Sequence, residues 1–164
     1  MLRNKTRAPE FELEDEIGAW TSLTALRNSR PFLLLFSRSA DCPTTRRDLL
    51  AYANVYDRLR MLDAGMAAIT ADTPDNHRAL RDQLGLPFSV FSDADFAVSD
   101  QYGVYRSDEA EEGPQPHGEP AVFILDVDGS IAYSQILSGP KGLANPAELA
   151  LVVLYMCHNG GRYW

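Results

Sequence analysis

The sequence predicts an α/β fold in which a central mixed β-sheet carries helices on both faces. Strand-like and helix-like segments alternate along most of the chain, which is the pattern of parallel strands joined by right-handed helical crossovers. The segments 31–36 and 66–70 are almost continuously apolar, as strands buried on both faces are. An Asp-Gly pair at 128–129 then predicts an antiparallel hairpin, which makes the sheet mixed.

The chain begins with an expected N-terminal β-hairpin extension. Apolar residues at 11–13 and Trp20 flank the turn-forming segment 15–18, which predicts a short hairpin at the edge of the domain. A short helical turn is expected at 22–27. The run Pro-Phe-Leu-Leu-Leu-Phe at 31–36 is then expected to be a central strand.

A long helix is expected after Cys42. Its apolar residues recur at steps of three and four and therefore share one buried face; they are Leu49, Tyr52, Tyr56, Leu59 and Leu62. Gly65 is expected to end this helix. After the strand 66–70, a second helix should begin at an N-cap Thr73 with Pro74 as its first residue, and end at Gly85.

The last part of the chain is expected to contain five further elements. The segments 88–91 and 93–102 predict a short strand and a short helix. The strands 120–126 and 130–137 should form the Asp-Gly hairpin, and a helix should follow over 146–158, capped by Asn145. With no internal repeat, residues 1–164 are expected to form a single domain.

The composition limits the classes of function. The chain has 164 residues, is 45% hydrophobic and carries 15 basic against 23 acidic residues, a net charge of −8. This acidity argues against nucleic-acid partners and anionic membranes. Two cysteines and three histidines are too few for a zinc cluster, so no metal or other cofactor is expected. The absence of a signal sequence or of an apolar run of ~20 residues predicts a cytoplasmic protein with reduced thiols.

Cys42 is the candidate nucleophile. Pro43 at the first helical position makes Cys42 the N-cap, so the free N–H groups and the positive end of the helix dipole point at its sulfur. Arg38, Arg46 and Arg47 add positive charge nearby, whereas the neighbouring Asp41 opposes it. Thr45, one turn along the helix, can offer its hydroxyl. Such surroundings favour the thiolate form. The alternative is that Cys42 is a small buried apolar residue.

Several segments together resemble the peroxiredoxins. They are Ala8-Pro-Glu-Phe-Glu-Leu, Ser22-Leu-Thr-Ala-Leu-Arg, Phe36-Ser-Arg-Ser-Ala-Asp-Cys-Pro-Thr-Thr, Leu86-Pro-Phe-Ser-Val-Phe-Ser-Asp, Tyr102-Gly-Val and Phe123-Ile-Leu-Asp-Val-Asp-Gly-Ser-Ile. The resemblance runs from Ala8 to about Leu154. It is to peroxiredoxin-like members of the alkyl hydroperoxide reductase/thiol-specific antioxidant (redoxin) superfamily, in which an arginine stands four residues before a Cys-Pro-x-Cys motif, as Arg38 stands before Cys42. The resemblance implies a thioredoxin-like fold and an antioxidant peroxidase.

Three departures from the family pattern affect the expected site. The family motif is Pro-x-x-x-Thr-x-x-Cys, but this chain has Ser39 at the threonine position and Leu35 at the proline position. Thr45 stands where the branch has its second active-site cysteine. The pair Glu119-Pro120 stands where peroxiredoxins have an arginine, and Pro120 resembles the cis-proline of thioredoxins instead.

These residues predict a peroxidase with one reactive cysteine. Cys42 would react with hydrogen peroxide or an organic hydroperoxide, Thr45 and Arg38 would act with it, and an external thioredoxin- or glutathione-like thiol would recycle it. Ser39, Pro43, Arg46 and Pro120 would support this site, with Arg38 or Arg46 replacing the family arginine. Cys157 is expected to be a packed structural thiol, although a disulfide across a homodimer interface stays open. The alternatives are a monothiol disulfide reductase and a binding module without turnover.

The histidines and one acidic segment carry weaker expectations. His77 and His158 are expected at the surface. His117 is expected in a solvated loop, with contact to the site as the alternative. The segment 107–119 has five acidic residues and no basic one, and is expected to be an irregular solvated loop; those residues are Asp108, Glu109, Glu111, Glu112 and Glu119. The alternative is a flap over Cys42 that repels anionic substrates.

Overall fold

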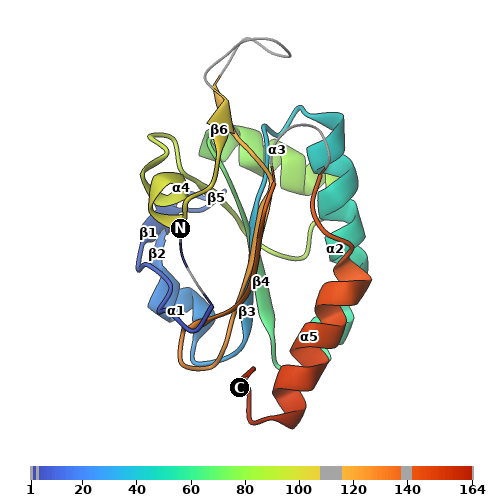
Figure 1. Cartoon of the computed structure of the whole chain (residues 1–164). Coiled ribbons are helices and arrows are strands. Elements are labelled where there is room, and N and C mark those ends of the chain that lie inside the picture. Colours follow the sequence, from blue (N-terminus) through green and yellow to red (C-terminus); the bar gives the residue numbers. More distant parts are fainter. Residues whose placement is uncertain (1, 3, 108–115, 138–141, 164) are drawn as a thin grey trace.

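The computed structural model describes residues 2, 4–107, 116–137 and 142–163 (Figure 1). Within these residues the strands are β1 (Glu12–Glu14), β2 (Trp20–Ser22), β3 (Phe32–Phe36), β4 (Gly65–Thr70), β5 (Val90–Ser92), β6 (Arg106–Ser107), β7 (His117–Gly118), β8 (Ala121–Leu125) and β9 (Ile131–Ile136). The helices are α1 (Leu23–Arg27), α2 (Pro43–Met61), α3 (Pro74–Leu84), α4 (Ala97–Tyr102) and α5 (Pro146–His158).

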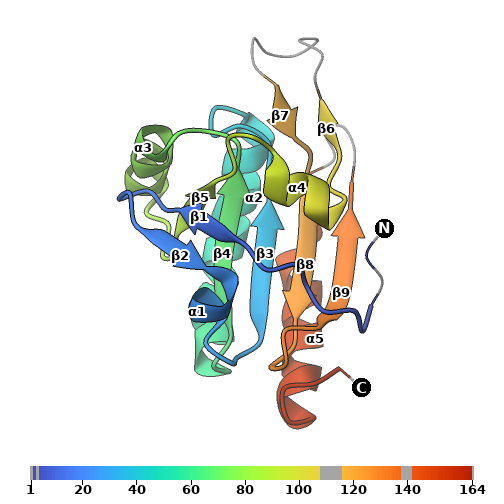
Figure 2. The same cartoon turned by 90° about the vertical axis from the view of Figure 1, so that its left-hand side faces the viewer.

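A seven-stranded mixed sheet runs through the middle of the molecule in the order β2-β1-β5-β4-β3-β8-β9 (Figure 2). The central strands β3, β4 and β5 are parallel, and β8 and β9 extend the sheet antiparallel to β3. The β1–β2 hairpin pairs antiparallel with β5 at the opposite edge. The predicted fold class, a mixed sheet with an N-terminal hairpin extension, is confirmed.

Two apolar cores lie on the two faces of this sheet. Leu33 and Leu35 of β3 belong to the core under α2, α3 and α5, whereas Phe32, Leu34 and Phe36 belong to the core under α1 and α4. Figure 1 shows the sheet between these two layers of helices. All five β3 side chains are buried, so the apolar run predicted this strand correctly. No described helix has the length and apolarity to cross a membrane.

Three helices begin as their capping residues predict. Cys42, Thr73 and Asn145 are the N-caps of α2, α3 and α5, and a proline follows each of them in the first turn. Gly65, however, does not end α2. The helix ends at Met61, and Gly65 starts β4, where a Cβ atom would lie 2.5 Å from the Phe32 ring. This glycine is therefore required by the close approach of β3, not by a helix cap.

Two further expectations need correction. The short strand begins at Val90 and the following helix at Ala97, because the Asp93 carboxylate accepts the Val98 and Ser99 N–H groups at the start of that helix. The expected loop 107–119 is not irregular at its ends, because β6 and β7 pair there. Residues 108–115, with four of the five acidic residues and hence the flap hypothesis, lie outside the described residues.

Candidate functional site

Cys42 closes the loop that joins β3 to α2. Its N–H donates to the Ser39 carbonyl at 3.0 Å, which folds residues 39–42 into a turn. Cys42 has extended backbone angles (φ −70°, ψ 124°), and Pro43 starts the helix directly after it. Its thiol is free, half-buried and makes no capping hydrogen bond. The predicted N-cap position is confirmed, and the α2 N-terminus lies at this half-exposed thiol.

Asp72 holds the middle of this loop from the neighbouring parallel strand. Its Oδ2 accepts the Ala40 N–H and, at 3.3 Å, the Thr70 hydroxyl. The Asp72 N–H donates back to Thr70 Oγ1 at 3.0 Å. Asp72 was not among the site residues predicted from the sequence. The available signal was its place just after β4, because the carboxyl ends of parallel β3 and β4 lie at one edge of the sheet.

His77 extends this set of contacts into the core, so the expectation of a surface histidine is wrong. Its ring is completely buried, with Nε2 2.6 Å from Thr70 Oγ1 and Nδ1 3.2 Å from Ser92 Oγ. Burial lowers the pKa of His77 to about 4. The negative charges of Asp72 and Glu16 raise this pKa, but their effect is smaller than that of burial. His77 stands three residues before the buried Leu80 on α3, and this helical spacing indicated its face.

Arg38 lies in a buried charged cluster at the start of the same loop. Its Nη2 is 2.8 Å from His117 Nε2, and its Nε is 3.6 Å from Glu119 Oε2. The His117 Nε2 atom is 3.7 Å from Glu119 Oε1. The expectation of a solvated His117 is therefore wrong, because this histidine contacts one of the predicted site residues. His158, in contrast, is exposed as expected.

Arg46 binds the loop backbone. Its Nε donates to the Ala40 carbonyl at 3.0 Å, and its Nη2 donates to Gln83 Oε1 at 2.9 Å. The N–H and the carbonyl of Ala40 are thus both held, by Asp72 and Arg46 respectively. Arg46 acts as a support for the loop that ends at Cys42.

Thr45 lies in the first turn of α2 with its side chain 2% exposed. Its Oγ1 has no hydrogen-bond partner among the described residues. A buried hydroxyl without a protein partner is costly, which makes Thr45 a candidate to bind a water molecule, a ligand or a reaction intermediate. Thr45 is three residues after Cys42, so both share the first turn of one helix.

Pro120 is buried directly before β8, but its comparison with a thioredoxin cis-proline is wrong. The described residues contain no cis peptide bond. The chain here is extended: the Glu119 N–H donates to the Tyr105 carbonyl at 2.7 Å, and the Pro120 carbonyl accepts the Leu137 N–H at 2.9 Å. These two bonds continue strand pairing through the proline, which fits a trans peptide.

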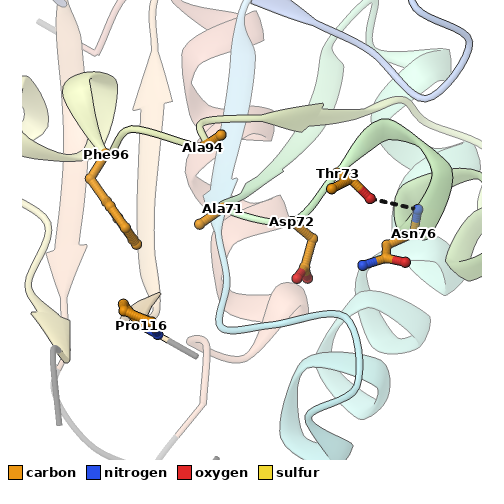
Figure 3. A pocket seen from close by; sticks show the side chains of 7 residues that line it. All are labelled: Ala71, Asp72, Thr73, Asn76, Ala94, Phe96 and Pro116. Atoms are coloured by element: carbon orange, nitrogen blue, oxygen red, sulfur yellow. Dashed lines mark hydrogen bonds between the residues drawn. The ribbon is translucent and has the colours of Figure 1, made fainter. Parts of the chain in front are cut away.

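A pocket of about 370 Å³ adjoins the loop (Figure 3). Its lining combines apolar and polar side chains from the segments after β4 and β5, from the starts of α3 and α4, and from the residue before β7; they are Ala71, Asp72, Thr73, Asn76, Ala94, Phe96 and Pro116. Asp72 belongs both to this wall and to the contact with Ala40, which places the pocket beside the Cys42 loop. No described group of three or more His, Cys, Asp or Glu side chains could hold a metal ion.

These features define an α/β protein with a free thiol at the carboxyl edge of its central sheet. Comparison with known sequences makes the class specific, because the AhpC/TSA family model matches residues 5–134. The chain therefore belongs to the AhpC/TSA family, as its resemblance to the peroxiredoxins predicted.

Two relatives and one solved structure are similar to this chain. A Coxiella burnetii protein named as a bcp peroxiredoxin is 28% identical over 127 residues, which cover 77% of this chain and 83% of the relative. The chloroplastic peroxiredoxin Q of Populus jackii is 28% identical over 102 residues, 62% of this chain but 47% of that protein. The chain thus spans about half the length of that plant relative. The crystal structure of peroxidoxin BcpB from Mycobacterium tuberculosis superposes with a TM-score of 0.79 at 20% identity, covering 92% of this chain and 95% of that one. This likeness confirms the thioredoxin-like fold.

Proposed function

We propose that this protein is a thiol peroxidase that reduces hydrogen peroxide or organic hydroperoxides through Cys42. The observation that carries the proposal is the free, half-buried Cys42 thiol at the N-cap of α2, at the end of a loop held through both backbone groups of Ala40. The relatives named as peroxiredoxins support the reaction class.

The proposed reaction consumes one peroxide and two external thiols. The Cys42 thiolate attacks one peroxide oxygen, the O–O bond breaks, and the cysteine becomes a sulfenic acid. The leaving hydroxide or alkoxide takes up a proton to give water or an alcohol. One external thiol then condenses with the sulfenic acid, which releases water and leaves a mixed disulfide, and a second thiol displaces Cys42. Two thiols are oxidised to a disulfide while one peroxide is reduced.

Arg38 is the cation that we assign to the charge on the leaving oxygen. The Arg38 side chain is 10% exposed, whereas the Arg47 side chain is 64% exposed and pairs with Asp48. Arg46 is committed to the Ala40 carbonyl and Gln83. Thr45, with its buried hydroxyl, is assigned a hydrogen bond to the reacting sulfur or to the peroxide.

The remaining support comes from backbone geometry. Ser39 closes the turn by accepting the Cys42 N–H, and Pro43 fixes the start of the helix. Pro120 leads into β8, next to the end of β3. An external thiol of the thioredoxin or glutathione type is the proposed reductant, since Thr45 stands where a second cysteine would. A cytoplasmic location, where such thiols are kept reduced, is proposed with it.

The test is a peroxide reaction followed with and without Cys42. The wild-type protein should consume hydrogen peroxide and cumene hydroperoxide in the presence of a thiol reductant, and Cys42→Ser should fall to the uncatalysed rate, because serine cannot form a sulfenic acid. Wild-type protein that reduces a glutathione mixed disulfide but no peroxide would contradict the proposal and select the disulfide reductase instead. If the protein reacts with neither substrate, the proposal is also wrong, and a binding module without turnover is the function that then fits.

A further inference from the structure

Three ionisable side chains from two distant segments meet at the carboxyl edge of the sheet. Arg38 follows β3, whereas His117 lies in β7 and Glu119 precedes β8. Arg38 Nη2 contacts His117 Nε2 at 2.8 Å although 79 residues separate them in the chain. Their side chains are only 10%, 11% and 9% exposed, for Arg38, His117 and Glu119 respectively.

The chemistry of the contact fixes the direction of the hydrogen bond. A guanidinium has donors and no acceptor, so Arg38 donates and His117 Nε2 accepts. Glu119 supplies the negative charge, 3.6 Å from Arg38 Nε and 3.7 Å from His117 Nε2.

Such an arrangement restricts the arginine strongly. A buried guanidinium must be paired, and here one N–H group of Arg38 is hydrogen-bonded to His117 while its Nε lies at ion-pair distance from Glu119, whose Oε2 accepts no hydrogen bond among the described residues. Arg38 is four residues before Cys42, and the turn closed by the Cys42 N–H and the Ser39 carbonyl lies between them. The cluster thus fixes a cation at the second residue after the central strand β3, in the segment that ends at the reactive thiol.

We propose that His117 and Glu119 are positioning residues for Arg38, which they hold in the orientation that stabilises the leaving oxygen of the peroxide. The inference rests on the proposed peroxidase function and deepens it. The same contacts could have either of two roles. They join the β6–β7 pair to the end of β3 and so could only stabilise the fold, or they could hold Arg38 for the reaction with peroxide. A stem that only stabilises the fold would affect every reaction of Cys42 equally, whereas a positioned cation matters for peroxide.

The experiment measures two second-order rates of Cys42, one with hydrogen peroxide and one with the neutral alkylating reagent iodoacetamide. His117→Ala should slow the peroxide reaction about tenfold, as expected for the loss of a hydrogen bond to a charged group, and leave alkylation within about twofold. His117→Gln, which keeps an acceptor oxygen, should recover most of the peroxide rate. His158→Ala, which changes the exposed histidine of α5, is the matched control and should leave both rates unchanged.

A double-mutant cycle with Arg38→Met then tests whether His117 acts through Arg38. In the Arg38→Met background, His117→Ala should cause no further loss of peroxide rate, and Glu119→Gln should behave in the same way. Equal losses in both backgrounds, equal losses of the peroxide and iodoacetamide rates, or no recovery with His117→Gln would each overturn the inference. A wild-type protein that does not react with peroxide would instead overturn the proposed function, so the two failures are distinguishable.

Discussion

His77 is a completely buried base between two hydroxyl groups, those of Thr70 and Ser92. Desolvation lowers its pKa to about 4, so the ring is neutral in the folded protein at pH 7. Its partner Thr70 also donates to Asp72, the residue that holds Ala40. The protonation state of His77 therefore bears on the stability of the core next to the Cys42 loop.

The folded protein should lose stability as the pH falls from about 6.5 to about 4, the values for the unfolded and folded states. In this window the unfolded state binds a proton that the folded state does not, so the free energy of unfolding decreases with falling pH. The shift corresponds to a His77 contribution of about 3–4 kcal/mol at ~1.4 kcal/mol per pH unit. Urea unfolding at a series of pH values measures how the free energy of unfolding depends on pH. His77→Gln is the comparison, because the two proteins share all their other titrating groups. Equal pH slopes for the two proteins would contradict the prediction.

Individual residues were predictable where their signals are local. Cys42 follows from a buried strand, a short loop and a proline, all within a few positions of one another. His117 and Asp72 make contacts 79 and 32 residues away, and no spacing in the sequence indicates those partners. The spacing of His77 and Leu80 places them on the same face of α3, but it does not show whether the histidine lies at the centre of the buried face or at its exposed margin.

At the scale of elements, the β3–α2 loop is held from two neighbouring helix–strand units. Asp72, between β4 and α3, accepts the Ala40 N–H, and Arg46, in α2, donates to the Ala40 carbonyl. Arg46 also reaches Gln83 on α3, so the loop, α2 and α3 are linked by side-chain bonds. A loop with both polar groups of its central residue engaged is pre-organised before any substrate arrives.

Asp72→Ala should loosen this loop. Loss of a hydrogen bond to a charged acceptor should make the Ala40 amide exchange with solvent at least ~10-fold faster and slow the peroxide reaction of Cys42. Hydrogen exchange followed by NMR measures the first effect directly. Asp82→Ala, which removes an exposed aspartate from α3, is the control and should leave the Ala40 amide unchanged. An unchanged exchange rate in Asp72→Ala would show that Asp72 does not restrain the loop.

Among the elements, those with strong periodicity or caps were predicted and the shortest were not. The proline-marked starts of α2, α3 and α5 agree with the sequence prediction within the limits of helix assignment. The two-residue strands β6 and β7 are too short to show a period. The Pro120 carbonyl likewise accepts the N–H of Leu137, which directly follows β9, and the local sequence does not specify this partner.

At the scale of the whole molecule, α2 separates the two cysteines. Cys42 caps its N-terminus, and the Cys157 thiol donates to the carbonyl of Leu62, the C-cap residue, at 3.3 Å. The 19 residues of α2 span about 28 Å, whereas a disulfide needs Cα atoms within ~7 Å. Cys157 also packs against the core under α5, as expected for a structural thiol. Burial and the charge of Asp63 raise its pKa, which disfavours its thiolate.

This distance predicts a catalytic cycle with one protein thiol. Peroxide treatment without reductant should leave Cys42 as a sulfenic acid that a dimedone reagent captures, and peptide mapping should find no Cys42–Cys157 disulfide within one chain. Cys157→Ala should retain the full peroxide turnover of the wild type, with Cys42→Ser as the inactive reference. An intrachain disulfide would contradict the separation of the two thiols along α2. Covalent dimers that form on oxidation and disappear in Cys157→Ala would show that Cys157 of a second copy of the chain resolves the sulfenic acid. Full turnover of Cys157→Ala with an added thiol would instead show that the external thiol is the reductant.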